Sequence, residues 1–210
     1  MDFIIQGISY WQKGGGIMYV LLLCSIFVIT IGVERIVYFA RADSGRKFAG
    51  EFYHLCAKGR LVDAKNLAIK TKGDLAFLLN ISLDRINRKD FDTKIFFEAH
   101  SNISLAKFRA RLYYLNIIIT MAPLLGLLGT ISGMISAFSI FNTQENQSSA
   151  VTGGIGEALI ATATGLCVAI IALTIHSYFI QRVDHIVTDM ELSFSAIEIQ
   201  LQRGNKNEAS

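Results

Sequence analysis

The sequence predicts an all-α membrane protein with three transmembrane helices and long helices that extend into the cytoplasm. Hydrophobic residues make up 52% of the 210 residues and charged residues only 18%, whereas soluble domains carry about 25% charged residues. Three stretches lack Asp, Glu, Lys and Arg altogether: 14–33, 112–144 and 158–181. Because about 20 apolar residues in a helix cross a bilayer core, we expect transmembrane helices at 17–40, 115–138 and 155–179.

The charged residues predict the orientation of these helices. The segment 41–114 holds 15 Lys/Arg and the tail 180–210 holds three, whereas the N-terminal segment 1–16 has Lys13 alone and the loop 139–154 has none. Cytoplasmic segments carry the excess of Lys and Arg. We therefore expect 1–16 and 139–154 to be periplasmic, and 41–114 and 180–210 to be cytoplasmic. Glu34 and Arg35, at the inner end of the first span, are interpreted as an interfacial anchor.

The predicted cytoplasmic loop 41–114 has the pattern of several helices. Apolar residues recur at helical spacing, as in Phe48, Phe52 and Leu55, and the sequence breaks at Lys58-Gly59 and at Lys72-Gly73. A third helix is predicted from about residue 75 to 87. Asp92 is a candidate cap for a further helix, which has no stop signal before the membrane and is predicted to run unbroken into the second span.

The second and third spans are rich in small residues, unlike the first. Small residues four apart let membrane helices approach closely. Such stripes contain Gly126, Gly129 and Gly133 on the second span, and Ala158, Gly165 and Ala169 on the third. We predict that these six residues pack the two helices together.

Hydroxyl groups and one carboxyl lie among these small residues. Thr130 and Thr162 fall at matching depth if the two spans are antiparallel neighbours, and Thr164 and Glu157 share one face of the third span. A helical threonine commonly binds its own helix, and Glu157 at an interfacial helix start is a second ordinary interpretation. The functional interpretation is a narrow polar path formed by Thr130, Thr162, Glu157 and Thr164.

A proton path requires a group near the bilayer midplane that binds and releases protons. Between residues 112 and 181 the only carboxylates are Glu145, in the outer loop, and Glu157, near the outer edge. If protons cross here, the central carboxylate must come from another chain. No Cys/His spacing predicts a metal or a cofactor, no nucleophile–base cluster predicts an enzyme, and the mixed charges argue against nucleic-acid binding.

Two motifs resemble the ExbB/TolQ/MotA proton-channel family. Residues 122–134, Ala-Pro-Leu-Leu-Gly-Leu-Leu-Gly-Thr-Ile-Ser-Gly-Met, are similar to the family's second-helix motif, and residues 156–166, Gly-Glu-Ala-Leu-Ile-Ala-Thr-Ala-Thr-Gly-Leu, to its third-helix motif. By these motifs, Thr130 and Thr162 match the pore threonines and Glu157 matches the family's acid. The three spans and the large loop after the first favour the ExbB/TolQ branch.

The resemblance implies an inner-membrane subunit that couples the proton-motive force to work on an outer-membrane system. It implies a homopentamer around an ExbD/TolR-like single-span partner that supplies the proton-carrying Asp, with a TonB-like protein as the next component in energised nutrient uptake. A TolQ-like role in envelope maintenance is the alternative within the family. A structural membrane scaffold without ion conduction, and a membrane enzyme or autonomous channel, are the alternatives outside it.

Overall fold

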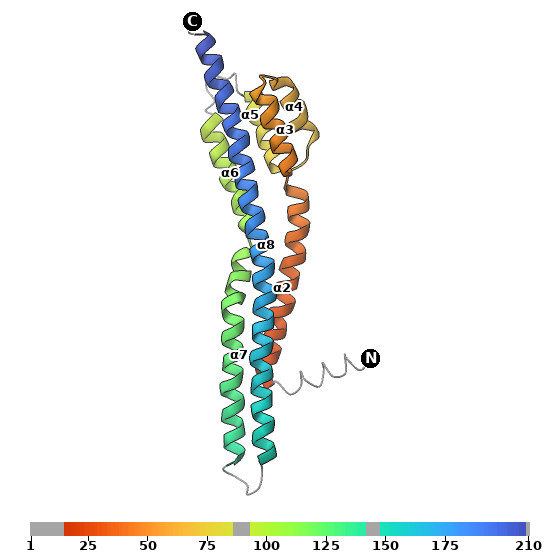
Figure 1. Cartoon of the computed structure of the whole chain (residues 1–210), viewed down its shortest axis with the longest axis vertical. Coiled ribbons are helices and arrows are strands. Elements are labelled where there is room, and N and C mark those ends of the chain that lie inside the picture. Colours follow the sequence, from red (N-terminus) through yellow and green to blue (C-terminus); the bar gives the residue numbers. More distant parts are fainter. Residues whose placement is uncertain (1–14, 86–92, 142–147, 209–210) are drawn as a thin grey trace. The chain divides into compact units, whose positions relative to one another are not determined.

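The computed structural model describes residues 15–85, 93–141 and 148–208, and every regular element in these ranges is an α-helix. The predicted N-terminal segment up to residue 14, Asp92 and Glu145 lie outside the described residues. The elements, labelled in Figure 1, are α2 (Gly15–Ala42), α3 (Arg46–Ala57), α4 (Leu61–Lys70), α5 (Asp74–Arg85), α6 (Thr93–Arg109), α7 (Leu112–Phe141) and α8 (Ser148–Glu208).

The chain divides into two compact units, and the division follows the distribution of charge. One unit comprises Met1–Val33 and Arg111–Ser177 and is called the apolar unit here. The other comprises Glu34–Ala110 and Tyr178–Ser210 and is called the polar unit. The apolar unit contains the predicted span 115–138 and most of the other two, whereas residues 34–40 and 178–179 of those spans belong to the polar unit.

Membrane-compatible surfaces distinguish the apolar unit. Within residues 15–85, 93–141 and 148–208, three helices are long and apolar enough to cross a membrane. Their large apolar side chains face outward, with exposed fractions of 66% for Leu23, 63% for Leu124 and 62% for Ile170. A water-soluble protein rarely exposes so much contiguous apolar surface, whereas lipid provides a favourable environment for it. The prediction of an all-α membrane protein is therefore confirmed.

The helices extend further than the predicted spans. Helix α7 ends at Phe141 and α8 begins at Ser148, so residues 148–154 of the predicted outer loop are helical. Helix α8 has 61 residues, which corresponds to about 90 Å at 1.5 Å per residue. A bilayer core about 30 Å thick accounts for only part of that length.

Short helices α3, α4 and α5 form the predicted helical loop of the polar unit. Gly59 and Gly73 lie between them with φ angles of 75° and 121°, a backbone conformation that glycine adopts without steric cost. The predicted breaks at these glycines are confirmed. The core of the unit is built on fully buried side chains that include Phe52, Leu79 and Ile197.

One sequence prediction about this region is wrong. The helix that begins at Thr93 does not run unbroken into the second span, because α6 ends at Arg109 and α7 begins at Leu112. Arg111 has a φ of 67°, which is left-handed and unfavourable for a non-glycine residue. At this break the side chain of Arg35 in α2 donates a hydrogen bond to the backbone carbonyl of Lys107 at 3.0 Å.

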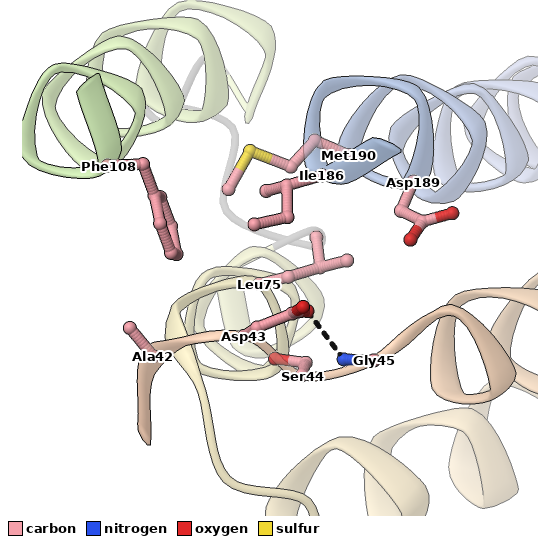
Figure 2. Close-up of a pocket in the computed structure, with 9 residues that line it drawn as sticks. All are labelled: Ala42, Asp43, Ser44, Gly45, Leu75, Phe108, Ile186, Asp189 and Met190. Carbon is pink, nitrogen blue, oxygen red and sulfur yellow. Dashed lines mark hydrogen bonds between the residues drawn. The ribbon is translucent and has the colours of Figure 1, made fainter. Parts of the chain in front are cut away.

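A buried carboxyl lies beside a small cavity in the polar unit (Figure 2). Asp189 of α8 is 8% exposed, and it lines a cavity of about 10 Å³ together with the connection between α2 and α3. On that connection, Asp43 accepts a hydrogen bond from the Gly45 N–H at 2.8 Å and pairs with Arg182 at 2.9 Å. Burial raises the pKa of the Asp189 carboxyl and Asp43 adds to the rise, while Arg46, His185 and Arg182 oppose it.

Ionisation of Asp189 is expected to destabilise the polar unit. Because its pKa is raised in the folded state, the folded chain binds this proton more tightly than the unfolded chain does. The contribution of Asp189 to the free energy of unfolding is therefore largest at low pH and falls as the pH rises from about 4, the ordinary pKa of Asp, through the raised pKa. Asp189→Asn should remove this component from the pH profile of the melting temperature, whereas Asp184→Asn, at an exposed position, should retain it. Identical profiles for the wild type and Asp189→Asn would contradict the prediction.

Candidate functional site at the contact of helices α7 and α8

Helices α7 and α8 touch along the small residues of α7. A Cβ atom added to Gly126 would lie 3.0 Å from the Cα of Thr162, and one added to Gly129 would lie 2.5 Å from the Cβ of Ala161. A Cβ at Gly133 would lie 3.0 Å from the Cβ of Ala158. These three glycines therefore allow an approach that side chains would prevent.

The facing helix contributes glycines of its own. A Cβ at Gly165 would lie 2.5 Å from the carbonyl oxygen of Ala122, and one at Gly154 would lie 2.6 Å from the Cβ of Ala137. Ala122 and Gly154 were not among the residues predicted from the sequence to pack the two helices. Helical spacing carried a signal for Gly154, because it precedes Ala158 by four residues on the same stripe. Ala169, also predicted to pack, is 8% exposed.

Thr162 makes a polar contact between the two helices. Its hydroxyl donates to the Gly126 carbonyl oxygen at 3.0 Å. Most helical threonines instead donate to a carbonyl of the preceding turn. The bond across the helices depends on the close approach at Gly126, where an added Cβ would lie only 3.0 Å from the Cα of Thr162. The hydroxyl oxygen retains acceptor capacity for a further donor.

The other two predicted pore threonines are bonded within their own helices. Thr130 donates to the Leu127 carbonyl at 2.6 Å, and Thr164 donates to the Ile160 carbonyl at 2.8 Å. Among the hydroxyls of these three threonines, only that of Thr162 joins α7 to α8 in the described part of the chain. The structure thus places Thr162 in the helix contact and gives Thr130 and Thr164 the local bonds typical of helical threonines.

Glu157 lies inside α8, not at its start. The helix begins at Ser148, so the interpretation of Glu157 as an anion at a helix N-terminus is wrong, because that effect fades within the first turn. Its side chain is half-buried. At 100° per residue, Thr164 shares the face of Glu157, while Thr162 lies about 140° away from it. Glu157 and Thr164 therefore occupy a different face of α8 from the one that carries Thr162 toward α7.

The sequence that includes both helices is similar to that of known proteins. Residues 76–192 match the model of the MotA/TolQ/ExbB proton channel family. An ExbB-like protein of Synechocystis sp. is 37% identical over 171 residues, which cover 78% of this chain and 66% of that protein. An ExbB homologue of Methanothermobacter thermautotrophicus is 26% identical over 91% of this chain and 69% of its own length.

A third relative matches over a shorter stretch of the chain. Biopolymer transport protein ExbB of Salmonella typhimurium is 41% identical over 71 residues, which cover 33% of this chain and 29% of that protein. The chain thus spans only part of the length of these relatives. The family model covers more than half of the chain, including α7 and the contact residues of α8. The chain belongs to the MotA/TolQ/ExbB proton channel family as an ExbB-like member.

Proposed function

We propose that this chain is the inner-membrane subunit of a proton-driven motor. In this proposal it assembles as a homopentamer around an ExbD/TolR-like single-span partner, with its N-terminus in the periplasm and its C-terminus in the cytoplasm. The assembly passes the proton-motive force through a TonB-like protein to energised nutrient uptake. Family membership supports the proton-channel role, and the ExbB-named relatives favour the uptake branch.

The contact between Thr162 and Gly126 is the observation that carries the proposal. It fixes a hydroxyl at a helix contact in the apolar unit, where an unpaired polar group would be costly. The hydroxyl hydrogen is engaged by the Gly126 carbonyl, so the oxygen faces any further group as an acceptor. A protonated carboxyl of a partner helix is such a donor.

The shortage of carboxylates explains why a partner is required. Glu145 and Glu157 are the only residues with a carboxylate side chain between residues 112 and 181. Threonine does not exchange protons near neutral pH. Proton transfer therefore depends on a carboxyl that another chain brings to Thr162. Glu157, on a separate face of α8, is proposed to act nearer the periplasmic end of the path.

Proton flux through the reconstituted complex tests the proposal. Thr162→Ala and Glu157→Ala are each expected to lower the flux by about tenfold or more. For Thr162, a tenfold loss corresponds to one hydrogen bond of about 1.4 kcal/mol. Both variants should still assemble with the partner. Energised uptake in cells should fail in parallel.

Thr174→Ala is the matched control, because it makes the same change on the same helix. Thr174 is exposed and donates to the Ile170 carbonyl of its own helix at 2.8 Å, so its removal should leave the flux unchanged. Normal flux in both Thr162→Ala and Glu157→Ala would refute the proposal. Flux without any partner would identify an autonomous channel, and no flux in any complex would identify a scaffold.

A further inference from the structure

Arg35 is a buried cation that binds the end of another helix. The residue is 3% exposed. Its Nη1 donates to the Lys107 carbonyl at 3.0 Å and to the Phe108 carbonyl at 3.4 Å. Its Nε and Nη2 donate to the two carboxylate oxygens of Glu34 at 2.8 and 2.7 Å. The interpretation of this pair as an interfacial anchor is wrong for Arg35, because its guanidinium faces protein.

The two carbonyls that Arg35 binds are those left over when α6 ends. In a continuous α-helix, the Lys107 and Phe108 carbonyls accept from the backbone N–H groups of Arg111 and Leu112. Helix α6 ends at Arg109, and buried terminal carbonyls must find other partners. Arg35 provides both of these bonds with a single nitrogen.

Aromatic rings hold this arrangement in place. The guanidinium carbon of Arg35 lies 4.7 Å from the centre of the Tyr38 ring. The Phe108 ring, which is fully buried, lies 5.4 Å from the Tyr38 ring and 5.0 Å from the Phe39 ring. The donor side chain and the last turn of α6 are therefore fixed against the same segment of α2.

We propose that Arg35 is a positioning residue. Its guanidinium competes with backbone N–H groups for the carbonyls at the end of α6 and so sets the residue at which α7 begins. The competition explains why a sequence without a stop signal breaks at Ala110 and why Arg111 adopts a left-handed backbone. This function of Arg35 rests in part on the proposed function, because α7 carries the Gly126 carbonyl to which Thr162 donates.

The Arg35→Lys variant distinguishes a positioning role of Arg35 from a role as a charged anchor at the membrane interface. Lysine retains the positive charge, so an anchor would survive the change. Its single ammonium group cannot reproduce the planar fork that binds a carboxylate on one side and two carbonyls on the other. Arg109→Lys is the matched control, since Arg109 is exposed and lies in the last turn of α6, the helix whose end Arg35 binds.

Hydrogen exchange of the full-length chain in lipid nanodiscs provides a measurement that does not depend on proton flux. In Arg35→Lys, the carbonyls of Lys107 and Phe108 recover backbone partners as the helix becomes continuous. The amide of Leu112, whose acceptor in a continuous helix is the Phe108 carbonyl, is then expected to exchange about tenfold more slowly. Arg35→Met, which removes the charge at similar length, should show the same change, and Arg109→Lys should match the wild type.

Unchanged or faster exchange at the Leu112 amide in both Arg35 variants would overturn the proposal. Proton flux of the complex is the second measurement. Arg35→Lys is expected to lower flux by several fold while assembly persists, and Arg109→Lys is not. If the wild-type complex conducts no protons, the proposed function fails, whereas the exchange result still decides the role of Arg35.

Discussion

Replacing Gly165 by valine is expected to prevent α7 and α8 from packing and to abolish the folded assembly. Even a single Cβ at this position would lie 2.5 Å from the Ala122 carbonyl oxygen and 3.1 Å from the Gly126 Cα. Both are backbone atoms, so no change of rotamer can relieve the overlap. Overpacking of this kind costs about 1–3 kcal/mol or more, and here separation of the helices would also break the bond from Thr162 to Gly126.

The yield and melting temperature of the purified full-length chain measure this effect. Gly156→Val is the matched control, because Gly156 lies on the same helix and a Cβ there would meet no atom within 4 Å. Both variants carry the same cost in helix propensity, so their difference isolates the contact with α7. Equal melting temperatures for the two variants would show that the close approach at Gly165 does not hold the helices together.

Replacing Phe108 by alanine is expected to lower the free energy of unfolding of the polar unit by about 3–5 kcal/mol. The ring is fully buried and contacts Tyr38 and Phe39 of α2, so its removal leaves a cavity in a cluster that the remaining rings cannot fill without moving. A loss of this size is a large share of the stability of a typical domain. Proteolysis or hydrogen exchange of the polar unit measures it in the full-length chain.

Phe77→Ala is the control for this change. Phe77 is also in the polar unit, but its side chain is 63% exposed. Because little of its area is buried, we expect its truncation to change stability by no more than about 0.5 kcal/mol. If the two phenylalanine variants were equally stable, the cluster around Phe108 would not be a packed core.

The motif-bearing helices were predictable because their information is local. Runs without charged residues identify membrane spans by length alone, and glycines and alanines at four-residue spacing identify a face suited to close packing. Gly126, Gly129 and Gly133 do lie against α8. The glycine breaks at Gly59 and Gly73 were also local, because they depend on backbone conformations that other residues adopt only at a cost.

The bonding of the hydroxyls was not predictable from spacing. Thr130, Thr162 and Thr164 look alike in sequence, since each lies among small residues of a membrane helix. Only the placement of one helix against another decides that Thr162 donates to the Gly126 carbonyl, while Thr130 and Thr164 donate within their own helices. The start of α8 at Ser148 likewise moved Glu157 from a helix terminus to a helix interior.

The sequence by itself determined that this protein is an all-helical membrane protein with a specific pair of small-residue helices, because lipid imposes length and polarity on each span separately. Only the tertiary structure decided where α6 ends. Nothing between Thr93 and Leu112 signals a break, yet Arg35, more than 70 residues away, donates to the carbonyls that a continuous helix would otherwise use. Helix propensity contributes only a small free energy at each residue. Charge-assisted hydrogen bonds from a buried guanidinium to two carbonyls contribute more.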